Sequence, residues 1–170
     1  MTKLLPNTDK LLKTPTTPWD FENPPFDVIE YVKEMVRFMR DHQGLGLASN
    51  QIETAFDQPT IRYSIFSMHC DPNIVCINPR IIDLSGDEIT LEEGCLSYPG
   101  LSVKIKRHQH LRARYQQPNG ETVTETYTGM TARVFQHEMD HLDGINFLSR
   151  ANRFHREQAM RKAARIMRRR

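Results

Sequence analysis

Two histidines four residues apart, His137 and His141, lie in a segment (130–144) whose apolar residues recur with the period of an α-helix. On such a helix the two imidazoles are offset by roughly 40° and 6 Å, so both can reach one metal ion from the same face. Glu138 lies about 60° and 4.5 Å from His141, near enough to hydrogen-bond a molecule on that ion yet displaced from coordination. The segment supplies two ligands and a base, although the histidine pair alone is also compatible with a half-buried amphipathic helix.

A catalytic site of this kind needs a third protein ligand and one position left for water. Cys95 is the preferred candidate, because it follows a glycine and precedes the turn Pro99–Gly100, where a thiol can project from a loop or strand end. Carboxylates stay open as alternatives, whereas Cys70 and Cys76 fit better as small buried apolar residues. A cation beside Cys95 would hold its sulfur as the thiolate.

The composition is typical of a soluble globular protein. Of 170 residues, 38% are apolar and 26% are charged, and the apolar stretches are short, which excludes a membrane span and favours one domain. The first six residues are not followed by the apolar region of a secretory signal, so we expect the protein in the cytoplasm. Three cysteines are an odd number in a chain long enough to fold without cross-links, and a disulfide framework is not expected.

The net charge of +2 conceals an uneven distribution. Residues 150–170 carry nine Lys or Arg and one Glu (+8), which leaves fourteen basic and twenty acidic residues (−6) for residues 1–149. The chain therefore has an acidic body and a basic C-terminal arm. We expect a catalytic domain over 1–149 and a basic helix or tail over 150–170, either within that domain or appended to it.

The order of the predicted elements indicates an α+β domain. Residues 1–25 hold five prolines and are expected to form extended chain and turns, with Asn23–Pro24 starting the first helix. Periodicity then predicts a helix at 26–42, strands at 61–66, 74–77, 101–105, 111–115 and 121–127, and helices at 130–142 and about 151–167.

A glycine-bearing turn follows the first helix and ends at Gln51. Taken alone, Gly44 and Gly46 could simply end that helix, and the segment lacks both the G-x-G-x-x-G pattern and the lysine of a phosphate-binding loop. A nucleotide site is therefore disfavoured. Glycines also let a backbone approach a substrate closely, and Gln51 offers an amide donor at the end of the turn.

Three motifs together resemble those of the peptide deformylase family: Gly44–Gln51, Glu93–Ser97 and Gln136–Gly144. The last two match the family's Glu-Gly-Cys-Leu-Ser and Gln-His-Glu-x-Asp-His-Leu-x-Gly at every defined position, and the order and spacing agree. Ser49 stands where the family usually has alanine, and the proline-rich start lacks the family's leading strand pattern. The resemblance implies antiparallel sheets packed around a central metal-binding His-Glu-x-x-His helix, with an N-terminal helix and a C-terminal basic helix.

The resemblance also implies an activity: removal of the formyl group from the N-terminal formyl-methionine of newly made polypeptides, with release of formate. It implies one divalent metal ion, with Fe²⁺ as the expected ion and Zn²⁺, Ni²⁺ and Co²⁺ as alternatives. The implied roles are metal ligation by Cys95, His137 and His141, proton transfer by Glu138, oxyanion binding by Gln51 and the N–H of Leu96, substrate backbone binding by Gly46, a methionine pocket of Leu45, Met130 and Val134, and a pocket rim at Arg133.

The expected substrates are nascent chains, and a basic arm suits docking on ribosomal RNA near the exit of those chains, with a solvated terminal helix as the alternative. We expect a monomer. Three other functions fit parts of the pattern. A metalloprotease normally takes its third ligand from beyond the helix, a blue-copper site does not draw both histidines from adjacent turns of one helix, and a silent RNA-binding module requires neither Glu138 nor Gln51.

Overall fold

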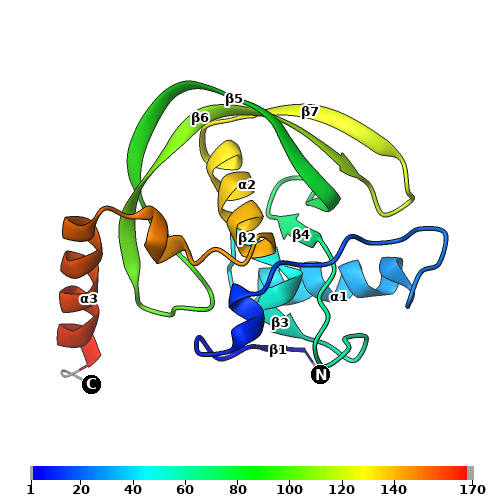
Figure 1. Ribbon diagram of the computed structural model, residues 1–170, viewed down its shortest axis with the longest axis horizontal. Helices are drawn as coiled ribbons and strands as arrows, with labels where there is room; N and C mark the ends of the chain where they lie inside the picture. The colour runs from blue at the N-terminus through cyan, green and yellow to red at the C-terminus, as the bar shows by residue number, and fades with distance from the viewer. Residues whose placement is uncertain (1, 168–170) are drawn as a thin grey trace.

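A computed structural model describes residues 2–167 of the chain (Figure 1). In that part of the chain the α-helices are α1 (Val28–Asp41), α2 (Gly129–Leu142) and α3 (Arg153–Met167), and the 3₁₀ turns are η1 (Lys10–Lys13), η2 (Ser49–Gln51) and η3 (Phe147–Arg150). The strands are β1 (Lys3–Leu4), β2 (Gly46–Ala48), β3 (Ile52–Glu53), β4 (Ile65–Met68), β5 (Ile74–Gly94), β6 (Ser102–Gln116) and β7 (Thr122–Thr128). Both sheets are antiparallel, which confirms the predicted α+β class.

The larger sheet has the strand order β2-β4-β5-β6-β7, and its three long strands arch around α2 (Figure 1). The two strands predicted at 101–105 and 111–115 form one strand, β6, which pairs with β5 on one side and β7 on the other. The alternation predicted for them is confirmed, because one face of β6 is buried through Val103, Ile105, Leu111, Ala113 and Tyr115. The strand predicted at 61–66 begins later, at Ile65.

The strand predicted at 74–77 continues to Gly94 in the structure. Residues 82–92 alternate apolar and polar side chains only in two short runs, Ile82–Ser85 and Ile89–Glu92, and none of these residues is buried. The register with β6 also shifts around Gly86, which has a φ of +72°. Such a bulge interrupts the period of two and conceals the strand.

Helix α1 begins after Asp27, whose side chain accepts hydrogen bonds from the N–H groups of Ile29 and Glu30. The predicted start at Asn23–Pro24 is therefore wrong. Asn23 instead donates from both its N–H and its side-chain amide to Asp20, in a turn before the helix. The helix buries one face against the sheet through Val28, Tyr31, Val32, Met35, Phe38 and Met39.

The N-terminal segment follows the surface largely without regular structure, as its prolines predict, and adds only β1 and η1. Trp19 anchors it: the indole is buried, and Asn78 accepts from the Trp19 N–H and donates to its carbonyl. Thr16 donates to the carbonyl of Leu142 at the end of α2. These bonds tie the segment to β5 and to α2, the helix that carries the histidine pair.

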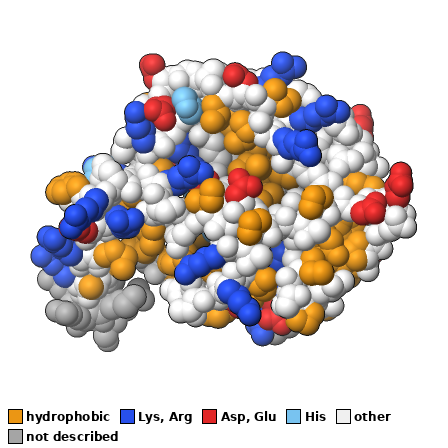
Figure 2. Space-filling view, in the orientation of Figure 1, with side chains coloured by type: hydrophobic (Ala, Val, Ile, Leu, Met, Phe, Trp, Pro, Cys, Tyr) orange, Lys and Arg blue, Asp and Glu red, His pale blue; other side chains and the backbone are white. Residues whose placement is uncertain are grey.

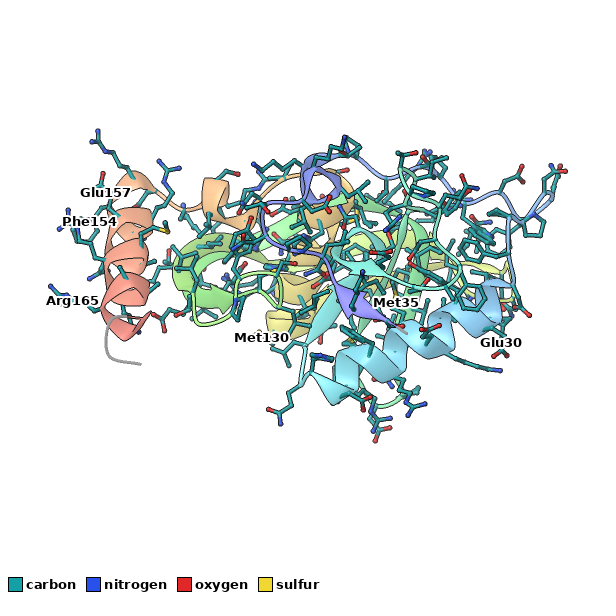
Figure 3. All side chains as sticks on the ribbon, turned by 90° about the horizontal axis from the view of Figure 1, so that it is seen from below. Glu30, Met35, Met130, Phe154, Glu157 and Arg165 are labelled. Atoms are coloured by element: carbon teal, nitrogen blue, oxygen red, sulfur yellow. The ribbon has the colours of Figure 1, made fainter. Side chains whose placement is uncertain are left out.

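Helix α3 stands as a column at one end of the molecule, carrying Phe154, Glu157 and Arg165 (Figure 3). It packs on β6 through the small residue Ala159, next to Ala151, while Phe154 is 71% exposed. The basic residues expected at 168–170 lie outside the described residues. Within residues 2–167, none of the helices has the length and apolar character needed to cross a bilayer.

Candidate active site

A cavity of about 590 Å³ opens between the end of β5, the turn that follows it, the start of β2 and one face of α2. Ten of the eleven residues predicted for the site line this cavity, and the exception, His141, is buried behind it. A larger hollow of about 830 Å³ lies between α3 and β6. None of the predicted site residues lines that hollow, so the smaller cavity is the candidate active site.

The cavity wall brings together Cys95, His137 and His141, whose possible ligand atoms all lie within 4.8 Å of one another. The Cys95 sulfur is 3.2 Å from Nε2 of His141. In a tetrahedral site with bonds of about 2.0–2.3 Å, ligand atoms lie roughly 3.5 Å apart, so this spacing fits one ion. Burial lowers the pKa of His141 well below its usual range, which keeps the ring in the neutral form that metals bind.

Glu93 orients His137, because its carboxylate lies 3.0 Å from Nδ1 and so leaves Nε2 free to face Cys95 and His141. Arg107 donates two hydrogen bonds to Glu93, and Arg133 donates a third. Burial by itself raises the pKa of Glu93, but the hydrogen bonds from His137 and Arg107 outweigh it and lower that pKa to about 2. Glu93 is therefore a fixed anion behind the ligand.

The network of ion pairs around Glu93 extends to the C-terminal arm. Arg107 also donates to Asp140 on α2, at 2.9 Å, and Asp140 accepts further bonds from Arg150 at the end of η3. Arg107 and Asp140 are almost fully buried, whereas the Arg150 side chain is half exposed. One chain of charged residues therefore runs from His137 to Arg150, the first residue of the arm.

We expect Glu93→Gln to lower metal affinity by about 10- to 100-fold. The neutral amide would orient His137 less firmly and make its imidazole a weaker metal ligand. The measurement is competition for the ion against a chelator. Glu92→Gln is the matched control, since Glu92 is exposed and its only ion pair in the described chain is with Lys162, at 4.0 Å. Unchanged affinity in Glu93→Gln, with only a lower melting temperature, would restrict Glu93 to a structural role.

Glu138 is buried beside the cluster, and its Oε2 has no hydrogen-bond partner. Burial raises the pKa of this carboxyl to about 7. Its other oxygen lies against Gly46, where a Cβ would overlap the carboxylate and crowd Val134. Glycine at 46 is therefore required for the close approach of β2 to Glu138.

Gln51 is held in one orientation at the edge of the cluster. Its Oε1 accepts from the N–H of Ala48 at 2.8 Å, which turns Nε2 toward the sulfur of Cys95 at 3.3 Å and the hydroxyl of Ser97 at 3.1 Å. The neighbouring Asn50 donates to the carbonyl of His141 and so ties this turn to α2. The amide donor predicted at Gln51 thus lies next to the ligand cluster.

Arg133 does not lie at the rim where it is predicted. Its side chain is buried, with Nη1 on Glu93 and the carbonyl of Ile105 and Nη2 on the carbonyl of Ile89. The buried anion Glu93 attracts the guanidinium inward, and the sequence does not reveal that pairing. The surface of the cavity mouth is instead formed by Leu45 and Met130, which are each more than half exposed.

The orienting residues are the part of the site that sequence reasoning misses. Glu93 and Asp140 stand inside the two motifs that match the family at every defined position, but the sequence does not show what either residue does. Arg107 carries no such signal, because it acts on residues 14 and 33 positions away in the chain, and Asn50 stands inside the first motif but acts on His141, 91 positions away. Their roles become visible only when the sheet is folded over α2.

Three ligands suited to one ion, a buried carboxylate beside them and a cavity open to solvent are the features of a metal-dependent hydrolase. The family model for polypeptide deformylases matches residues 1–157. A peptide deformylase from Aquifex aeolicus is 36% identical over 159 residues, covering 94% of this chain and 92% of the relative. One from Desulforudis audaxviator is 41% identical over 127 residues, covering 73% and 77%. The chain belongs to the peptide deformylase family, whose members remove N-terminal formyl groups from nascent peptides.

Solved structures agree with this assignment. The peptide deformylase from Synechococcus elongatus in complex with actinonin has a TM-score of 0.83 and 29% identity, covering 95% of this chain and 85% of that one. The enzyme from Thermotoga maritima has a TM-score of 0.78 and 30% identity, covering 89% and 98%. Family membership decides against the alternatives of a protease, a blue-copper protein and a silent binding module.

Proposed function

We propose that this cavity removes the formyl group from N-terminal formyl-methionine with one divalent ion held by Cys95, His137 and His141. The observation that carries the proposal is the convergence of these three ligands within 4.8 Å beside the buried Glu138. An ion held there would lower the pKa of a bound water from about 15.7 toward about 7, which supplies the nucleophile that a poorly reactive formamide requires. We propose Fe²⁺, with Zn²⁺, Co²⁺ and Ni²⁺ as ions that suit the same thiolate and imidazole donors.

Glu138 carries the proton in this reaction. Its carboxylate takes a proton from the attacking water and delivers it to the amide nitrogen as the carbon–nitrogen bond breaks, so that formate and a free amine leave. Two observations support this role: Oε2 has no competing partner, and the side chain sits within the wall of the cavity.

Gln51 and the backbone N–H of Leu96 stabilise the negative oxygen that develops on the formyl carbon. The Gln51 amide is already turned toward Cys95 by its bond from Ala48, so it needs no rearrangement during the reaction. Leu96 follows Cys95 directly and lines the same cavity, which supports a donor close to the reacting carbon.

The methionine side chain of the substrate binds against Leu45, Met130 and Val134, and Gly46 admits its backbone. All four residues line the cavity. Leu45 and Met130 are apolar yet exposed, so covering them with a methionine side chain removes apolar surface from water. That gain is the proposed source of selectivity for methionine.

A formate-release assay joined to metal analysis tests the proposal. We expect one divalent ion per chain, and formate from formyl-Met-Ala-Ser but no cleavage of acetyl-Met-Ala-Ser or of internal peptide bonds. A chelator should remove the ion and the activity together, and restoring Fe²⁺ should return both. A metal-loaded protein that releases no formate would refute the proposed reaction.

We further propose that residues 1–149 form the catalytic domain and that 150–170 form an arm which docks on ribosomal RNA. The protein then works as a monomer in the cytoplasm, where chains with formyl-methionine emerge. Lys and Arg side chains gather at this end of the molecule (Figure 2). The exposed cations on α3 are Arg153, Arg156, Arg161, Lys162 and Arg165, against the single acidic Glu157.

We expect ribosome association to be steeply salt-dependent, because neutralising each phosphate releases counterions. Changing Arg153, Arg156, Arg161 and Arg165 to Gln should weaken it and flatten the plot of log affinity against log salt, by about 0.7 to 0.9 for each phosphate that the variant no longer neutralises. Hydrolysis of formyl-Met-Ala-Ser should not change. The matched control changes four exposed cations of the body, Lys3, Lys10, Lys33 and Arg37, to Gln. Equal binding by the two variants would contradict docking through α3.

A further inference from the structure

The middle of β5 is an open strand edge that begins at the active-site cavity. β4 pairs with β5 only over Ile74–Ile77, and beyond that point β6 is the only strand neighbour of β5 in the described chain. Glu92, Glu93 and Gly94, at the far end of β5, line the cavity. Apart from the Ile89 carbonyl, which accepts from Arg133, the backbone N–H and C=O groups that point away from β6 along this edge are available to another extended chain.

One face of this edge is apolar and exposed. Leu84, Ile89 and Leu91 are 41%, 36% and 41% exposed. They lie opposite Leu111, Arg107 and Ile105 on β6, and all three of these partners are buried. Because paired residues share a face, this apolar row lies on the same side of the sheet as α2. It lies outside the area that α2 covers, so it stays exposed.

The other face of the same edge is polar. Thr90 and Glu92 lie opposite Lys106 and Lys104, and Glu88 forms an ion pair with Lys106 at 2.7 Å. An extended chain added to this edge would therefore meet apolar contacts at every second residue and water at the others.

Arg133 connects the edge to the cavity, since it lines the cavity and bonds the carbonyl of Ile89. The path from Leu91 to Leu84 is about 23 Å at 3.3 Å per residue, room for about seven more residues of an extended peptide. A second copy of this chain is a poor occupant, because residues 81–94 contain five acidic residues and no basic one. Pairing this edge with itself would place like charges side by side.

We propose that residues 82–92 of β5 extend the substrate site: they bind, as an added strand, the part of the nascent chain that follows its first residues. The inference rests on the proposed deformylation and adds a preference to it. Substrates with apolar side chains at alternate positions beyond the third residue bind more tightly than substrates without them.

The test compares three formyl-peptides under steady-state conditions. One is the tripeptide formyl-Met-Ala-Ser, one is a decamer with valine at positions 4, 6 and 8 among serines, and one is a decamer of the same composition with its valines grouped at 8, 9 and 10. We expect kcat/KM for the alternating decamer to exceed that of the other two by about tenfold, through a lower KM, since buried apolar area and strand pairing stabilise its complex.

Leu91→Asp and Leu84→Asp should each remove this gain and leave tripeptide hydrolysis unchanged. Thr90→Asp is the matched control, because it adds the same charge to the polar face of the same strand, and it should keep the gain. Leu84 lies far from the cavity, so its variant remains informative if Leu91→Asp perturbs folding.

Equal kcat/KM for the two decamers, or a gain that survives both leucine variants, would overturn the inference while tripeptide hydrolysis still supports deformylation. Absence of tripeptide hydrolysis would instead refute the proposed function itself. Sedimentation tests the remaining alternative, a second copy of this chain on the same edge. A concentration-dependent dimer that Leu91→Asp abolishes, while the kcat/KM advantage of the alternating decamer stays unchanged, would make this edge an interface between copies. That result would also overturn the inference.

Discussion

Replacing Glu138 with alanine should lower formate release by about 10²- to 10⁴-fold and leave the metal ion bound. Glu138 is not one of the three clustered ligands, and its Oε2 is buried without a partner. Its removal therefore takes away the proton carrier and leaves the ligand set complete. Turnover of formyl-Met-Ala-Ser and the metal content of the same preparation are the two measurements.

Glu138→Gln separates proton transfer from packing, because the amide keeps the size of the side chain and its contact with Gly46 but cannot take a proton. It should be as inactive as Glu138→Ala. His137→Ala and His141→Ala should behave differently and lose the ion. If Glu138→Ala lost metal and activity together, Glu138 would be a ligand and the assignment would be wrong.

Cys95→Ser should weaken metal binding by more than about a hundredfold, beyond the 10- to 100-fold typical of residues that only orient a ligand. A serine hydroxyl is a much poorer donor than a thiolate to a borderline-soft ion. With Co²⁺ as a probe, the thiolate charge-transfer absorption should disappear, and chelator competition gives the change in affinity.

Cys70→Ser and Cys76→Ser are the matched controls, since both thiols are free and neither belongs to the cluster. Cys70 is half buried and Cys76 is fully buried, so the second variant should lose stability but keep the ion. Loss of the ion in either control, with normal affinity in Cys95→Ser, would show that a different sulfur holds the metal.

The sequence predicts best what depends on local spacing. The helix with His137 and His141 follows from residues four apart, and the buried face of β6 follows from alternation, because both periods are properties of the backbone. Cys95 is a candidate through its motif and turn, and the fold brings it to the histidines. The class of fold and the family follow from the same patterns.

Long-range pairing and charge burial are not predictable from local patterns. The extension of β5 past Ile77 is hidden because the bulge at Gly86 separates its two short alternating runs, Ile82–Ser85 and Ile89–Glu92. The family resemblance places Arg133 at a pocket rim, whereas Glu93, 40 positions away, holds its guanidinium inside. Helix α1 begins after Asp27, whose side chain caps it, and not after Asn23, whose side chain bonds Asp20 instead.

The hydrogen bonds from Arg150 to Asp140 determine at which residue the C-terminal arm could be replaced by the arm of a related protein. A chain cut before residue 150 would leave Asp140 on α2 with Arg107 as its sole cationic partner, in a buried position one residue from a histidine of the cluster. A junction placed after Ala151 keeps both that pair and the small residue packed near β6. Chimaeras with new arms, whether produced by gene fusion or by recombination during evolution, therefore have a natural joint at 151–152, which lets the targeting of the enzyme change while its metal chemistry stays the same.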